Sequence, residues 1–134
     1  MKKITLIAAL LLAGCADQNT STVAPTIQQP SHASAAAQRH TDGMMAETAK
    51  YTPADPAKRG QAAQNAFNHY LKVYEAGVQV HAAGKTPEQA KVISQQLAQK
   101  IAADIHPQKE ADIAVTKAVT AHTSAAFLDG YNGK

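Results

Sequence analysis

The chain has 134 residues, of which only 4% are aromatic, and its 13 basic and 10 acidic side chains give a formal net charge of +3. Lys2 and Lys3 belong to an N-terminal segment that we expect to be removed, so eleven basic residues then stand against ten acidic ones and the charge falls to about +1. A nearly neutral chain without a block of like charge lacks the surface that binds nucleic acid, and we expect no nucleic acid partner.

Residues 1–14 are predicted to be a cleaved export signal. Two lysines follow the start methionine, a mostly apolar run extends from Ile4 to Leu12, and the small residues Ala13 and Gly14 end the segment. This order of basic, apolar and small residues is typical of a signal peptide. The run is too short for a mature membrane-spanning helix, which needs about 20 apolar residues.

The sequence Leu12-Ala13-Gly14-Cys15 resembles the lipobox of bacterial lipoproteins, in which the cysteine is lipidated and then becomes the N-terminus. Cys15 is the only cysteine of the chain, and we predict that it carries the lipid anchor. Each buried CH2 group contributes about 0.8 kcal/mol, so several acyl chains would hold the protein on a membrane. The alternative is an ordinary cleaved signal with a cysteine placed there by chance.

The predicted location is the cell envelope. In Gram-negative lipoproteins an Asp directly after the lipidated cysteine usually marks retention in the inner membrane. Ala16 takes that place here, so the resemblance favours the outer membrane if the source is Gram-negative. With no second cysteine, the mature chain can form no intramolecular disulfide.

Residues 15–55 are predicted to be the lipidated cysteine and a flexible tether. Their many Ser, Thr, Asn, Gln and Pro residues offer too little apolar surface to offset the entropy of ordering the chain. Ala33 to Lys50 contains good helix formers and could form a transient helix, although Asp42 and Gly43 interrupt the pattern.

A first stable helix is predicted from Pro56 to Ala83. Asp55 and Pro56 suit a helix start, and Gly84 suits its end. A broad apolar face at helical spacing follows from Phe67, Leu71, Tyr74 and Val78. Gly77 weakens a helix relative to Ala, so we expect it to mark a close helix crossing.

Two further helices complete the predicted domain. Thr86, Pro87 and Gln89 predict a capping box that starts a helix ending near His106, because Pro107 disfavours a helical residue before it. A last helix is expected from about Pro107 to Leu128. The predicted fold class is all-α, with a small antiparallel three-helix domain at residues 56–134.

The sequence contains no recognisable pattern for chemistry. Its six histidines are never spaced as a local ligand pair, and zinc-binding helices usually place ligands four residues apart. Nucleophile elbows and phosphate-binding loops are also missing. We therefore expect no metal site, no cofactor, no small-molecule substrate and no enzymatic activity.

Four of the six aromatic residues form two pairs at helical spacing. Tyr70 and Tyr74 lie in the first predicted helix, and Phe127 and Tyr131 lie near the C-terminus. One interpretation is a small aromatic core in which the C-terminus packs on the first helix. The other is an exposed aromatic patch that contacts a partner protein.

Three short motifs resemble a family of small enterobacterial lipoproteins named for plasmid entry exclusion. They are Tyr74-Glu75-Ala76-Gly77, Gly84-Lys85-Thr86-Pro87-Glu88-Gln89-Ala90 and Phe127-Leu128-Asp129-Gly130-Tyr131-Asn132-Gly133. The resemblance covers the signal and the last 75 residues or so. It implies a non-enzymatic surface protein that reduces the uptake of related plasmids, with no established active residues to transfer.

The leading hypothesis is thus a lipid-anchored envelope protein that acts by contact with an envelope protein or with a second copy of itself, in entry exclusion. A second hypothesis is a structural or accessory lipoprotein of an envelope or cell-wall complex. The third, a periplasmic enzyme or metal binder, has no site in the sequence to support it.

Overall fold

The computed structural model describes residues 31–134, which are all-α as predicted but contain four helices instead of three. They are α1 (His32–Glu47), α2 (Pro56–Ala82), α3 (Pro87–Ile105) and α4 (Glu110–Asn132), and a short 3₁₀ turn, η1 (Ala49–Tyr51), follows α1. The predicted signal at residues 1–14 and the predicted lipidation site Cys15 lie outside the described residues.

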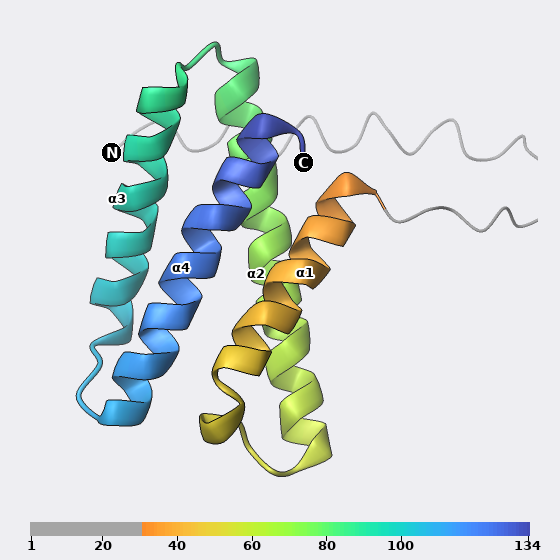
Figure 1. Ribbon diagram of the computed structural model, residues 1–134, viewed down its shortest axis with the longest axis vertical. Helices are drawn as coiled ribbons and strands as arrows, with labels where there is room; N and C mark the ends of the chain where they lie inside the picture. The colour runs from red at the N-terminus through yellow and green to blue at the C-terminus, as the bar shows by residue number, and fades with distance from the viewer. Residues whose placement is uncertain (1–30) are drawn as a thin grey trace, which may run out of the picture.

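The helices alternate in direction, with α1 and α3 running one way and α2 and α4 the other (Figure 1). The parallel helices α2 and α4 form the central pair, α1 packs on both, and α3 packs on α4. The expected hairpin of α2 with α3 is not packed, since these two helices make few contacts with each other. Among residues 31–134, no helix is both long and apolar enough to cross a membrane.

Helix α1 belongs to the folded domain, so the predicted tether at residues 15–55 is wrong from residue 31 onward. The side chain of Ser31 caps α1 by accepting a hydrogen bond from the backbone N–H of Ser34. Ala36 and Ala37 are completely buried, and Met44 is nearly so. The domain therefore includes α1 and does not begin at the predicted residue 56.

The sequence did not indicate that α1 belongs to the domain, because much of the buried face of α1 is polar. Thr41 and Thr48 are buried, and their hydroxyls donate to the carbonyl oxygens of Ala37 and Met44 one turn earlier. A buried hydroxyl that finds a partner within its own helix avoids most of the penalty of leaving water. A prediction from composition alone assigns such threonines to a flexible tether.

Two glycines let α2 and α4 approach each other closely. A Cβ atom on Gly77 would collide with the carbonyl oxygen of Phe127 and lie 2.8 Å from the backbone nitrogen of Tyr131. A Cβ atom on Gly130 would collide in the same way with the carbonyl oxygen of Tyr74. The close helix crossing expected at Gly77 is confirmed, and Gly130 is its counterpart.

The predicted helix ends hold for α2 and α3 but not for α4. Gly84, with φ of +74°, follows α2, and Thr86 and Gln89 form the predicted capping box of α3. Helix α4 starts at Glu110, three residues later than predicted, and continues past Leu128. Gly130 lies inside the helix at the crossing with α2, and Gly133 in the left-handed conformation follows the last helical residue.

Candidate functional site

A chain of four polar side chains connects α1 to α4. Nε2 of His40 lies 2.8 Å from Oδ2 of Asp129, and Nδ1 of His40 lies 3.2 Å from Nδ1 of His122. Nε2 of His122 lies 3.1 Å from Oε1 of Glu47. The order is carboxylate, imidazole, imidazole, carboxylate, and we call these four residues the histidine cluster.

Helical spacing brings the cluster together. His40, Gly43 and Glu47 follow one face of α1 at intervals of three and four residues, and His122 and Asp129 are two turns apart on α4. A Cβ atom on Gly43 would lie only 2.6 Å from Cε1 of His122. The glycine that interrupted the expected helix pattern therefore makes room for the imidazole ring of His122.

The cluster is shielded from water at one end and open at the other. The side chain of His40 is 10% exposed, and that of Glu47 is 58% exposed. Arg39 adds a second contact to Asp129 at 3.1 Å, but its side chain is 56% exposed. Exposed ion pairs contribute about 0–1 kcal/mol, so the partly buried contact between His40 and Asp129 is the better protected of the two.

Tyr70 of α2 lies against both imidazoles. Its ring centroid is 6.0 Å from that of His40 and 6.2 Å from that of His122. Its hydroxyl is buried and has no hydrogen bond partner. Burial raises the pKa of Tyr70, and the negative charge of Glu47 raises it further, so the phenol stays neutral beside the cluster.

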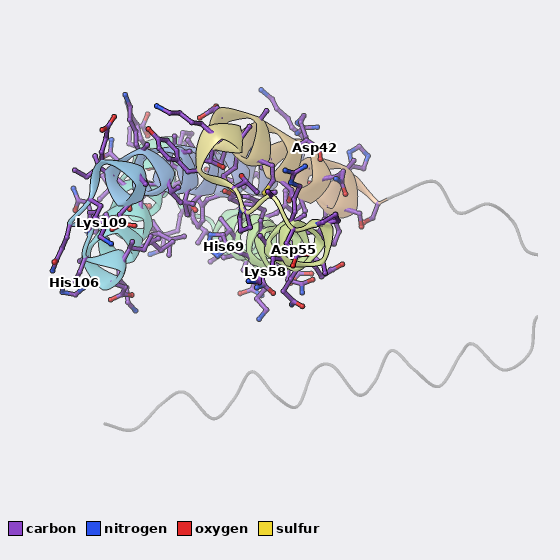
Figure 2. The ribbon with its side chains drawn as sticks, turned by 90° about the horizontal axis from the view of Figure 1, so that it is seen from below. Asp42, Asp55, Lys58, His69, His106 and Lys109 are labelled. Atoms are coloured by element: carbon purple, nitrogen blue, oxygen red, sulfur yellow. The ribbon has the colours of Figure 1, made fainter. Side chains whose placement is uncertain are left out.

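His69 is a neighbour of Tyr70 but not a member of the cluster. Its Nε2 lies 2.9 Å from Oγ1 of Thr123 on α4, and its ring centroid is 5.1 Å from that of Tyr70. Burial lowers the pKa of His69, with a smaller contribution from the positive charge of Lys72. Figure 2 places His69 away from His106, which lies beside Lys109 where α3 leads into α4.

Sequence reasoning missed the pairing of His40 with His122. The two residues are 82 positions apart, and no local spacing can reveal a pair that forms only when α1 packs on α4. The helical spacing of His122 from Ala118, Val119 and Ala126, which places it on the apolar face of its helix, was the one available sign. Within residues 31–134, no group of three or more His, Cys, Asp or Glu side chains is placed to hold a metal ion.

The predicted aromatic contact residues are core residues. Tyr70, Tyr74, Phe127 and Tyr131 are each 8% exposed or less. Tyr70, Phe127 and Tyr131 belong to one core cluster, and the backbone of Tyr74 meets Gly130 where α2 crosses α4. The interpretation as an exposed patch for a partner protein is wrong, because buried rings cannot contact one. The alternative is confirmed: the C-terminus packs on the helix that carries Tyr70 and Tyr74.

An apolar groove of about 370 Å³ lies between α2 and α3. It exists because α3 packs on α4 and makes few contacts with α2. Its apolar lining includes Val73 and Ala76 from α2 and Leu97 and Ile101 from α3. The polar residues that line it are His69, Lys72, Lys100 and Asp104. We call this surface the α2–α3 groove.

Comparisons of the chain with protein-family models, with curated proteins and with solved structures give no match.

Proposed function

We propose that this chain is a lipid-anchored protein of the bacterial envelope that acts by contact with another protein. The observation that carries the proposal is Cys15, the only cysteine, placed directly after Leu12-Ala13-Gly14 and an apolar segment. A cysteine modified with several acyl chains binds a membrane firmly, whereas a single chain binds only marginally. Ala16 after the cysteine favours the outer membrane of a Gram-negative host.

The domain would act close to the membrane that holds it. Only residues 16–30 separate Cys15 from Ser31, the residue that caps α1. Fifteen residues span at most about 50 Å when fully extended. A tether that continued to residue 55 would have allowed much more reach, so the folding of α1 restricts the partners to those near the membrane surface.

The α2–α3 groove is a surface that suits a protein partner. Its apolar floor would accept the apolar face of a partner helix. Two lysines and one aspartate at the groove favour a partner helix with acidic flanks, since complementary charge guides association and selects partners. The proposed occupant is therefore an amphipathic, acidic helix of another envelope protein.

The contact would serve plasmid entry exclusion. This part of the proposal rests on the resemblance of Tyr74-Glu75-Ala76-Gly77 and Phe127-Leu128-Asp129-Gly130 to that family. The same two motifs build the α2–α4 crossing. A family that shares them would therefore share this crossing.

The anchor is tested by metabolic palmitate labelling of the wild type and of Cys15→Ser, followed by membrane fractionation. We expect label in the wild type alone, with the wild-type protein in the outer-membrane fraction. An unlabelled wild-type protein released in soluble form would overturn the anchor and, with it, the exclusion proposal.

The contact is tested by the transfer of a related plasmid into cells that make each variant. Wild-type protein should reduce uptake, and Ile101→Glu should restore it because it places a charge in the α2–α3 groove. Gln99→Glu adds the same charge to the exposed side of α3 and should still reduce uptake. An anchored wild-type protein that leaves uptake unchanged would overturn entry exclusion and favour an accessory envelope or cell-wall role.

A further inference from the structure

The histidine cluster can be completely hydrogen-bonded in only one protonation state. The carboxylates of Asp129 and Glu47 only accept, so Nε2 of each imidazole must donate to its carboxylate. A neutral imidazole has one N–H, which leaves the two Nδ1 atoms as facing acceptors 3.2 Å apart. One added proton between them completes the chain, whereas two would place donor against donor.

The same single proton also balances the charge. Two carboxylates, Arg39 and one imidazolium sum to zero, whereas the cluster without the proton carries one net negative charge and the cluster with two carries one net positive charge. An unbalanced charge is disfavoured where water is partly excluded. Among the described residues of α2, the titratable side chain whose ring contacts both imidazoles is Tyr70, which is neutral. His69 contacts the ring of Tyr70.

We propose that His40 and His122 share one proton between their Nδ1 atoms, and that this proton fastens α1 to α4 within a limited window of pH.

The sign of the effect follows from proton counting. The ordinary pKa of a histidine in an unfolded chain is about 6.5. Well below that pH the unfolded chain binds two protons at these sites and the folded cluster one, so stability rises with pH. Well above it the unfolded chain binds none and the folded cluster one, so stability falls as pH rises. The contribution is largest between these limits.

This window would control α1, the helix nearest in sequence to the predicted anchor. Helix α1 follows the segment between Cys15 and the domain, and it covers the Tyr70 face of α2. Release of α1 outside the window would lengthen the connection to the anchor and uncover that face. This consequence rests on the proposed anchor, whereas the shared proton does not.

The proton is tested directly by ¹⁵N NMR of the full chain in detergent micelles with labelled histidine. We expect both Nε2 atoms of the cluster to be protonated and a scalar coupling to connect the two Nδ1 atoms through an N–H···N bond. Two unprotonated Nδ1 atoms without coupling from pH 5 to 8 would overturn the proposal. The measurement uses the wild-type chain and does not depend on the folding of a variant.

The pH window is tested by the urea midpoint of the full chain from pH 5 to 9. The wild-type midpoint should rise and then fall, and His122→Gln should lose the fall on the alkaline side. His69→Gln is the matched control and should keep that fall, because His69 lies outside the cluster. Parallel profiles for the wild type and His122→Gln would overturn the proposal.

Added zinc separates a shared proton from a shared metal ion. Zinc should leave the wild-type midpoint unchanged. A rise in the wild type that is absent in His122→Gln would show that the Nδ1 pair binds a metal ion, and would overturn the shared proton. None of these measurements involves Cys15 or plasmid uptake, so their failure is distinguishable from failure of the proposed function.

Discussion

Two buried tyrosines, Tyr70 of α2 and Tyr131 of α4, differ in the hydrogen bonding of their hydroxyls. The hydroxyl of Tyr131 donates to the backbone carbonyl of Lys85, whereas that of Tyr70 is buried without a partner. A satisfied hydrogen bond contributes about 1 kcal/mol, and an unsatisfied buried group costs about 1–3 kcal/mol. The tyrosine hydroxyl therefore stabilises the fold at Tyr131 and destabilises it at Tyr70.

Replacing Tyr70 by Phe should stabilise the protein by about 1 kcal/mol, because it removes the unpaired hydroxyl and keeps the ring. Tyr131→Phe, the matched control, should destabilise it by a similar amount. Both values are measured by urea unfolding at pH 7. A loss of stability in Tyr70→Phe would mean that the hydroxyl has a partner.

Tyr70 should also make the protein sensitive to alkali. Burial raises its pKa above the ordinary value of 10.0, with help from Glu47. As pH rises above 10, the unfolded chain releases this proton before the folded one does, so stability is lost in that range. Tyr70→Phe should unfold less readily than the wild type near pH 10.5. Equal alkaline losses in the two proteins would contradict the assignment.

His69 should reduce stability in acid. Burial lowers its pKa below the ordinary value of 6.5, so the unfolded chain binds the proton first as pH falls, and stability present above pH 6.5 is lost below it. Lys72→Met removes the second cause and should raise the pKa of His69, measured by NMR titration. Lys58 lies about 16 Å before His69 along the same helix, so Lys58→Met should leave the pKa of His69 unchanged. An unchanged titration in Lys72→Met would contradict the role of Lys72.

At the scale of the helices, the α2–α4 crossing holds the domain together. Gly77 and Gly130 lie where each helix meets the backbone of the other, and the aromatic rings of Tyr74 and Phe127 are buried next to them. Backbone contact at this distance leaves no space for a methyl group. Glycine weakens each helix by about 1 kcal/mol relative to alanine, and the close packing compensates for this.

Gly77→Ala should therefore destabilise the protein by about 3 kcal/mol or more, because backbone cannot move aside as a flexible side chain can. Gly60→Ala is the control on the same helix, where an added Cβ meets nothing within 4 Å. That change should stabilise the protein by about 0.5–1 kcal/mol. Urea unfolding of both variants decides the matter, and similar effects in the two would contradict the crossing.

At the scale of the whole molecule, α1 completes the domain. It packs on both central helices and supplies His40 to the cluster and Met44 to the core. Without α1, one side of the α2–α4 pair would be exposed, including the ring of Tyr70. The domain is thus a four-helix unit whose first helix lies nearest in sequence to the predicted anchor.

A fragment of residues 31–134 should accordingly be more stable than a fragment of residues 56–134. The expected difference is at least about 2 kcal/mol, since burying one large aromatic side chain contributes about 1.5–3 kcal/mol. Thermal melting followed by circular dichroism compares the two. Equal stability of the two fragments would mean that α1 is only loosely attached to the domain and belongs to the tether.

The fold was predictable wherever one short segment carries the information. Capping residues act on neighbouring backbone groups, so the helix ends that they mark were found from the sequence. They are Asp55 with Pro56, the Thr86–Gln89 capping box and Gly84. The apolar stripe of α2 and the close approach at Gly77 could be recognised for the same reason. The role of Gly130 was missed, because a glycine near a chain end also looks like a helix terminator.

The sequence by itself determined the all-α class, the limits of α2 and α3 and the aromatic pairs, because capping, propensity and helical periodicity are local. Only the tertiary structure decided that α1 folds, that the four aromatic residues are core, and that His40 meets His122. Burial and hydrogen bonding between residues 82 positions apart depend on how whole helices pack. That packing turned a polar segment into the fourth helix, and two isolated histidines into a candidate site.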